Sequence, residues 1–228
     1  MKCGSLPAKT DTAKQREFYE AELQPKMEQA KKGKITLLFM DASHFVMGCD
    51  FLGYIYGTVR RFVKTFSSRK RYNVLGAINF LTKKVTTVTN NTYITAGEVC
   101  ELLRKLAAEY AGKAINIVLD NARYQKCKVV QELSVELKIT LIYIPPYSPN
   151  LNLIERLWKF VKGRLRTRYY DEFVEFSKQI DFIVSGTCDG DKQRIDSLIG
   201  EKVQLFDDLV EITPNTFKSN KPQKLTAA

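Results

Sequence analysis

The sequence has very little of the two residue types that build most transition-metal sites. It contains one histidine, His44, and five widely spaced cysteines with no C-x-x-C pair. A zinc site built from several histidines is therefore impossible, and neither a zinc ribbon nor a disulfide framework is expected. Unpaired cysteines are typical of proteins of the reducing cytoplasm. Any metal chemistry is predicted to use carboxylates and an ion that prefers oxygen ligands.

Long apolar segments are missing as well. No apolar run approaches the roughly 20 residues that a helix needs to cross a bilayer. The chain does not open with a charged segment followed by an apolar one, so a secretory signal is not predicted. We therefore expect no membrane partner.

Positive charge is abundant by contrast. The chain has 36 Lys and Arg against 25 Asp and Glu, a formal net charge of +11, which favours a polyanionic partner such as nucleic acid. The excess lies in two stretches, residues 58–73 and 155–168. This concentration favours DNA held at one place over diffuse attraction to a membrane surface.

Hydrophobic periodicity predicts an α/β domain from residue 35 onward. Strands are expected at 35–40, 73–80, 84–89, 115–119 and 141–144, and helices at 95–110, 126–137 and 151–166. This order predicts a mixed five-stranded sheet flanked by helices. Residues 1–34 are predicted to form a solvated helical lead-in or linker, broken near Pro25. Residues 171–214 are predicted to be a C-terminal helical extension, and residues 215–228 a flexible polar tail.

Three acidic residues occupy positions that solvated charges rarely take. Asp41 and Asp120 each end an apolar strand, and ligands of open α/β sheets bind beyond the carboxyl ends of strands. Glu155 lies on the edge of the apolar face of the last strong helix. Each acid alone has an ordinary structural explanation as a turn former or a solvated side chain. Their combination predicts a carboxylate site.

The segments around these acids resemble a known family. LLFMDASHF, IVLDNARYQ and YIPPYSPNLNLIERLWKFVK are similar to the three catalytic blocks of DDE transposases, in the bacterial insertion-sequence branch of the mariner-like superfamily. The resemblance covers residues 35–170 and implies an RNase H-like fold. It also implies that the protein cuts DNA at insertion-sequence ends and joins the 3′-hydroxyl to target DNA. Asp41, Asp120 and Glu155 would be the catalytic acids that bind two Mg²⁺ ions, for which Mn²⁺ can substitute.

The chain departs from the family pattern in a few places. Relatives often carry an acid, a histidine and a proline where this sequence has Ala42, Gln125 and Leu153. The helix-turn-helix region that reads the element ends in relatives does not fit into residues 1–34. We therefore expect a separate DNA-reading half as a partner. The resemblance also implies a homodimer in the active complex with DNA, and a location in the bacterial cytoplasm, at the nucleoid when the protein is bound to DNA.

Candidate DNA contacts follow from charge and from position beside the acids. Glu155, Lys159, Lys162 and Arg166 share one stripe of a helix, where a phosphate backbone would run. His44 is interpreted as structural, with a phosphate contact as the alternative, and Trp158 as a core anchor. The predicted DNA contacts are Arg60, Arg61, Lys64, Arg69, Lys70, Arg71, Asn121, Arg123, Tyr147, Ser148, Arg156, Lys159, Lys162 and Arg166.

Two other functions fit the same residues. One is a different RNase H-like nuclease, which would share the acids but would not transfer a strand to a second DNA. The other is a non-catalytic DNA-binding remnant of a transposase, although the presence of all three acids argues against decay of the site.

Overall fold

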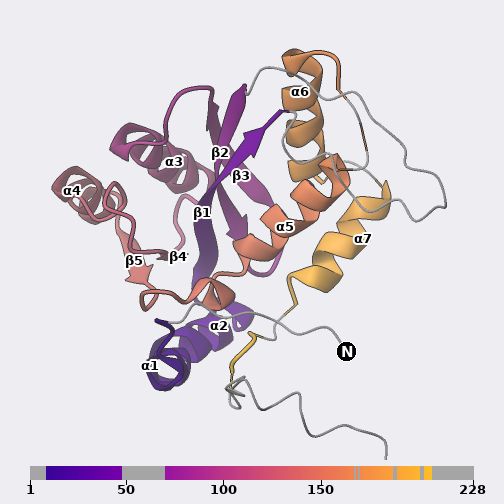
Figure 1. The fold of residues 1–228 in the computed structure, drawn as a ribbon. Helices are drawn as coiled ribbons and strands as arrows, with labels where there is room; N and C mark the ends of the chain where they lie inside the picture. The colour runs from indigo at the N-terminus through magenta and orange to yellow at the C-terminus, as the bar shows by residue number, and fades with distance from the viewer. Residues whose placement is uncertain are drawn as a thin grey trace, which may run out of the picture.

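A mixed five-stranded sheet forms the centre of the protein (Figure 1). The computed structural model describes residues 9–47, 70–166, 168, 170–186, 189–200 and 203–206. The strand order is β3-β2-β1-β4-β5, with β1, β4 and β5 parallel and with β1–β2 and β2–β3 antiparallel. The predicted fold class, an RNase H-like α/β sheet flanked by helices, is confirmed. The strands are β1 (Thr36–Val46), β2 (Arg71–Asn79), β3 (Val85–Asn90), β4 (Ile115–Leu119) and β5 (Ile139–Tyr143).

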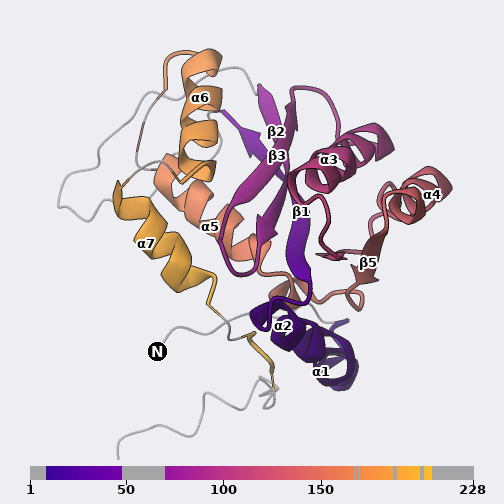
Figure 2. The same ribbon diagram turned by 180° about the vertical axis from the view of Figure 1, so that it is seen from behind.

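Helices cover both faces of the sheet (Figures 1 and 2). Helices α3 (Ala96–Glu109) and α4 (Lys128–Glu136) lie on one face, and α5 (Ile154–Leu165) and α6 (Phe173–Val184) on the other. Because side chains alternate along a strand, Leu38 and Met40 of β1 pack toward α3, whereas Leu37 and Phe39 pack toward α5. Helix α7 (Asp189–Leu198) contacts α5. Within the described ranges, the helices are too short or too polar to cross a bilayer.

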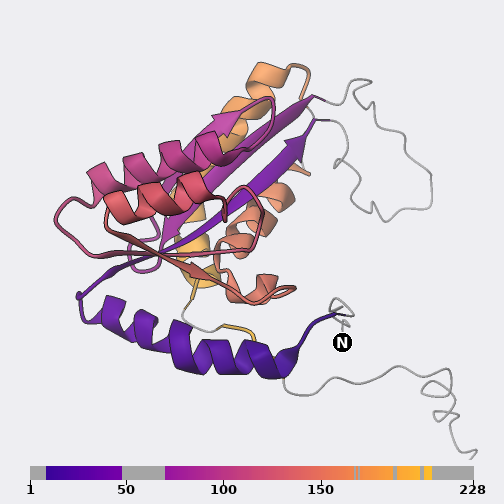
Figure 3. The same ribbon diagram turned by 90° about the vertical axis from the view of Figure 1, so that its left-hand side faces the viewer.

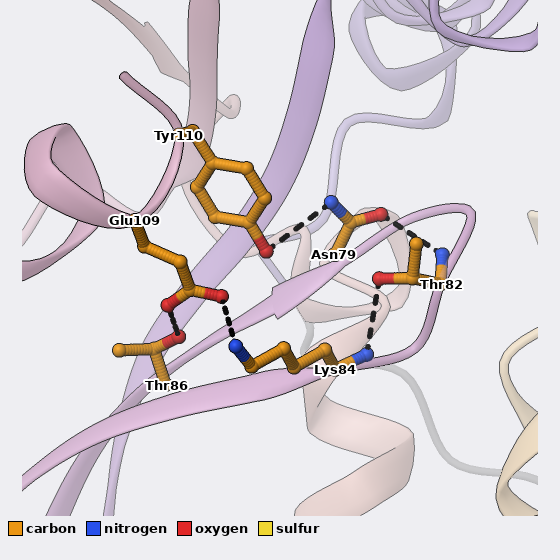
Figure 4. A network of polar contacts seen from close by, with 6 residues as sticks. All are labelled: Asn79, Thr82, Lys84, Thr86, Glu109 and Tyr110. Atoms are coloured by element: carbon orange, nitrogen blue, oxygen red, sulfur yellow. Dashed lines mark hydrogen bonds and ion pairs between the residues drawn. The ribbon is translucent and has the colours of Figure 1, made fainter.

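Helix α3 is fixed at both ends. Thr95 caps its N-terminus in a capping box with Glu98. At its C-terminus, Figure 4 shows a polar network that joins α3 to the β2–β3 turn. Glu109 accepts a hydrogen bond of 2.6 Å from Thr86 and pairs with Lys84 at 2.8 Å. These contacts fix the β3 edge of the sheet, which is distant from the candidate site.

Two element boundaries next to the candidate site differ from the prediction. β1 does not end at Asp41 but continues to Val46, because β2 pairs with it from Leu38 onward while β4 pairs with it only as far as Phe39. The last strong helix begins at Ile154 rather than at residue 151, because a short 3-10 helix, η2 (Pro149–Leu151), is followed by Asn152 in an extended conformation.

The predicted break at Pro25 is wrong. Helix α1 (Thr12–Phe18) continues through a π-helical turn, η1 (Tyr19–Leu23), into α2 (Gln24–Lys31), which has Pro25 in its first turn. The wider π turn lets the helix continue past a residue that has no N–H to donate.

The lead-in is also not solvated on all sides, because one side of it is buried. Leu23, Met27 and Ala30 are at most 4% exposed and belong to the same core as α5. Figure 3 shows α1 and α2 lying along one end of the sheet. This segment has few apolar positions, but those few lie on one side of the helix and pack against the core. Residues 215–228, the predicted tail, lie outside the described residues.

Candidate active site

The two aspartates lie side by side at the end of the parallel part of the sheet. Phe39 of β1 pairs with Val118 of β4, so two further residues along each strand bring Asp41 next to Asp120. The Oδ2 atom of Asp41 accepts a hydrogen bond of 3.1 Å from Trp158 Nε1. β4 ends before Asp120, whose Oδ1 accepts a bond of 3.0 Å from the Ala122 N–H. Both carboxylates are therefore oriented by hydrogen bonds from residues of the family-like segments, Trp158 for Asp41 and Ala122 for Asp120.

Glu155 completes the group from the helical side. It lies in the first turn of α5, where the helix dipole favours a negative charge. Its side chain is exposed and lines the same pocket of about 320 Å³ as Asp41 and Asp120. The segment Pro145–Pro149, called the Pro-rich wall below, also lines this pocket. The structure thus brings all three predicted acids to one pocket.

Negative charge accumulates in this pocket. Burial, followed by the charges of Glu155 and Asp120, raises the pKa of Asp41 to about 7. Partial burial also raises the pKa of Glu155, which Asp120 reinforces and Lys162 opposes. The pKa of the nearby Tyr124 hydroxyl is raised as well, by burial and then by the two aspartates. The pocket therefore disfavours further negative charge and would be stabilised by a cation.

The donor set fits a hard divalent ion, because the three acids offer only oxygen atoms. In the ranges that the structure describes, however, no three His, Cys, Asp or Glu side chains are close enough to hold a metal as they stand. Glu155 is the member with freedom to adjust, since it is exposed and has three rotatable side-chain bonds. Mg²⁺ also keeps several waters, so a complete set of protein ligands is not required.

Trp158 is the buried anchor that the sequence predicts, but it also contacts the site. Its indole packs on Gly76, which pairs with Asp41 in the β1–β2 register. A Cβ atom at position 76 would lie 2.8 Å from Trp158 Cη2, so a larger residue there would displace the indole. Glycine at position 76 thus makes room for the indole that donates to Asp41.

Asn152 is a site residue that the sequence analysis missed. It is 2% exposed and lines the pocket, and its Nδ2 donates to the carbonyl of Met40 at 3.0 Å. Its own carbonyl accepts from the Glu155 N–H at 3.2 Å. One residue thus links the backbone beside Asp41 to the backbone of Glu155. The available signal was its place three residues before Glu155 in the most specific of the three blocks.

Two further amides hold the Asp120 side of the pocket. Asn121, a predicted contact, donates from Nδ2 to the carbonyl of Ile144, where the Pro-rich wall begins. Gln125 is fully buried and, with its amide turned to donate, bonds to Oδ1 of Asp120 and to its carbonyl oxygen at 3.0 Å. Gln125 stands where relatives often carry histidine, and here it orients the carboxylate.

The predicted cationic stripe is accessible. Lys159 and Arg166 are exposed on α5, and Lys162 is half-buried with its Nζ 5.9 Å from the centre of the Phe45 ring. Arg156 points elsewhere: its Nη1 donates to the carbonyl of Leu198 at the end of α7, at 3.1 Å. The stripe beside Glu155 therefore consists of Lys159, Lys162 and Arg166.

The remaining predicted contacts are distributed over the molecule. Tyr147 is 52% exposed in the Pro-rich wall, whereas Ser148 is buried and donates to the Pro146 carbonyl, which is ordinary turn chemistry. Arg123 is exposed beside the pocket-lining residue Ala122. Lys70 and Arg71 are exposed at the start of β2, opposite the end of β1. The predicted contacts Arg60, Arg61, Lys64 and Arg69 lie outside the described residues.

His44 does not take part in the pocket. It lies three residues after Asp41 on the same strand, so its side chain is on the opposite face of the sheet. Its Nδ1 is 2.7 Å from Oδ1 of Asn73, a fully buried residue. This placement supports the structural interpretation.

Comparison with known proteins agrees with the geometry. The family described as DDE superfamily endonuclease matches residues 36–177. A protein of Shigella sonnei, "Insertion element IS630 uncharacterized 39 kDa protein", is 35% identical over 99 residues, which are 42% of this chain and 29% of that protein. The match therefore spans less than a third of that relative.

Solved structures share the fold. The "Mos1 transposase paired-end complex with left transposon end" has a TM-score of 0.64 at 14% identity, over 87% of this chain and 63% of that chain. The "catalytic domain of Mos1 mariner transposase" has a TM-score of 0.58 at 14% identity, over 86% and 93%. The three acids at the end of an RNase H-like sheet and the family match over most of the described chain lead to one assignment: the chain belongs to the DDE superfamily endonucleases.

Proposed function

We propose that this chain is the catalytic domain of a transposase that cuts DNA at insertion-sequence ends and joins the 3′-hydroxyl to target DNA. The observation that carries the proposal is the meeting of Asp41, Asp120 and Glu155 around one pocket at the carboxyl end of parallel strands. The insertion-element relative and the structural neighbours, which include transposase complexes, support DNA as the substrate.

Asp41, Asp120 and Glu155 would hold two Mg²⁺ ions, with Mn²⁺ as a substitute. When bound, two such ions stabilise charge on both the attacking and the leaving oxygen of a phosphodiester. The raised pKa of Asp41 supports this assignment, because the proximity of unneutralised carboxylates is unfavourable without a cation. No covalent enzyme intermediate is needed, and no nucleophilic side chain is assigned.

The protein's own residues would position the DNA. Lys159, Lys162 and Arg166 would bind the backbone along α5 without reading its sequence. Tyr147, exposed in the Pro-rich wall, would line the path of the strand at the pocket. A homodimer and a separate DNA-reading half are part of this proposal, as is action on DNA in the bacterial cytoplasm.

The test is a cleavage and transfer assay. The chain is incubated with Mg²⁺, a labelled duplex that carries one end of its element, and an unlabelled plasmid, beside Asp41→Asn, Asp120→Asn and Glu155→Gln. We expect nicked duplex and joined products from the wild type and neither from the variants. Calorimetric titration with Mn²⁺ provides a readout independent of cleavage, and the variants should lose binding.

The outcomes separate the alternatives. Cleavage without joined product would favour another RNase H-like nuclease, and preferential cleavage of an RNA–DNA hybrid would identify an RNA-strand cutter. DNA binding with neither cleavage nor metal binding would show a non-catalytic remnant. Cleavage at the wild-type rate by any of the three variants would refute the assignment of the acids.

A further inference from the structure

Helix α1 buries a polar residue and no apolar one. Gln15 is 1% exposed and is the fully buried residue of this helix, whereas Phe18 is only partly buried against the core. Burying an amide is unfavourable unless its hydrogen bonds are satisfied. Apolar packing of α1 against the core is limited to the partly buried Phe18, and the buried position of Gln15 must be explained by its hydrogen-bond partners.

Both ends of the Gln15 amide bond to the segment that carries the Pro-rich wall. Nε2 donates to the carbonyl of Tyr147 at 3.4 Å, and Oε1 accepts from Asn150 Nδ2 at 3.0 Å. Thr10 adds a second donor to the same Tyr147 carbonyl at 3.4 Å. Asn150 Nδ2 also donates to the carbonyl of Gln204 at 2.8 Å. Residues distant in sequence are thus tied to one turn.

The turn that receives these bonds is strained. Tyr147 has a φ of +58°, a left-handed backbone conformation that residues other than glycine rarely adopt. Such a conformation persists only where the surroundings determine it. The carbonyl of this same residue accepts the bonds from Gln15 and Thr10. The lead-in therefore stabilises the backbone conformation of the Pro-rich wall.

We propose that Gln15 is a positioning residue of the catalytic pocket, so that the lead-in helix is a working part of the active site. It holds the Pro-rich wall against Asp41, Asp120 and Glu155. Through η2 and Asn152, the same wall leads directly into the first turn of α5. The role in DNA cleavage rests on the proposed function, whereas the positioning of the wall does not.

Gln15→Met and Gln15→Glu test the proposal in the full chain. Methionine keeps the size and loses the bonds, and glutamate replaces the donor to Tyr147 by an acceptor. Glu17→Gln, on the exposed side of the same helix, is the matched control. Melting temperatures establish that each variant is folded.

The first readout is hydrogen exchange at Leu151 and Asn152, whose amides donate to Ser148 and Pro149 at 3.1 and 3.0 Å. We expect exchange to rise about tenfold in both Gln15 variants, with β4 amides unchanged as internal reference. Unchanged exchange in folded Gln15→Met overturns the proposal. This readout decides the matter even if the wild type cleaves no DNA, an outcome that would refute only the proposed function.

The second readout is the rate of cleavage at saturating duplex. We expect about a tenfold lower kcat with little change in KM, since the wall affects the reacting strand rather than the bulk of the DNA contact. Asn150→Ala removes one of the two Gln15 bonds from the other side, so adding Gln15→Met to Asn150→Ala should lower kcat by less than Gln15→Met does in the wild type. Faster exchange combined with unaltered kcat would contradict the catalytic role.

Discussion

The two halves of the candidate site are held in different ways. The sheet half, Asp41 and Asp120, follows from strands whose register is set by backbone hydrogen bonds. The helix half, Glu155 and the Pro-rich wall, depends on side-chain amides: Asn152 to Met40, Asn121 to Ile144 and Gln15 to Tyr147. The strand register is maintained by many backbone hydrogen bonds at once, whereas each segment of the helix half is held by a single amide side chain. The helix half should therefore be the more easily disturbed.

Burial differs between the halves in the same sense. Asp41 is desolvated and hydrogen-bonded by the indole of Trp158, and its pKa is raised to about 7. Glu155 is exposed at the start of a helix. The sheet half thus has a carboxylate whose charged form is unfavourable and whose position is fixed by the strand and by Trp158. The helix half supplies an exposed carboxylate whose side chain is able to change its rotamer. This division suits the proposed site, which would accept metal ions and DNA together.

The largest expected effect is the same for both halves of the site. Asp41→Asn, Asp120→Asn and Glu155→Gln should each lower the rate of Mg²⁺-dependent cleavage by at least about a thousandfold, since each removes a charge that a bound ion needs. A gel assay of labelled duplex measures the rate. Loss in the two aspartate variants alone would confine the chemistry to the sheet half and exclude Glu155 as a ligand.

Stability should separate the halves where activity does not. With its pKa raised to about 7, Asp41 stabilises the fold in its protonated form, and this contribution declines as pH rises from about 4 to about 7. Asp41→Asn keeps an acceptor for Trp158 and loses the charge, so it should raise the free energy of unfolding by up to about 4 kcal/mol at pH 8. Exposed Glu155→Gln should change it by less than about 0.5 kcal/mol.

Urea titrations at pH 5 and pH 8 in EDTA give these values. The gain in Asp41→Asn should shrink at pH 5, where wild-type Asp41 is already protonated. Trp158, the single tryptophan, provides a second reading, since its fluorescence should change with a midpoint near pH 7 and lose this change in the variant. An equal gain at both pH values would show that buried charge is not the cause.

The sheet half was predictable from the sequence, and the contacts that hold the helix half were not. Apolar runs and their terminal aspartates predicted the sheet half, because strand burial and strand order follow from local patterns. The residues that join distant segments were not predictable in this way. Gln15, Asn121 and Asn152 act through carbonyls 23 to 132 residues away, and nothing in local periodicity reports such a bond. The docking of the lead-in was missed for the same reason, since its few apolar residues pack only against a core formed later in the chain.

Asn152 offers an intermediate test of the helix half. Asn152→Leu leaves the Met40 carbonyl without its donor, and Asn152→Asp adds a charge near Asp41. Each should lower stability by about 1–3 kcal/mol and cleavage by about 10- to 100-fold through displacement of Glu155. Asn91→Asp, at an exposed position, is the control. Lost stability with cleavage unaltered at a temperature where the variant is folded would show that Asn152 supports the fold but does not set the geometry.

The smallest expected effect concerns DNA binding beside Glu155. Lys159→Gln combined with Lys162→Gln removes two cations from the helix half, so affinity for any duplex should decline about 3- to 10-fold at moderate salt. The slope of log K against log salt should become shallower by about 1.8, because fewer counterions are released. Lys32→Gln with Lys34→Gln makes the same charge change just before β1, at its N-terminal end and away from the pocket, and should leave both values nearly unaltered. Fluorescence anisotropy across a salt series measures both pairs. Equal slopes for the two double variants would mean that the whole basic surface attracts DNA and that α5 has no special part in holding it. A selective loss in the α5 variant would place the DNA backbone beside Glu155, the exposed carboxylate of the proposed site.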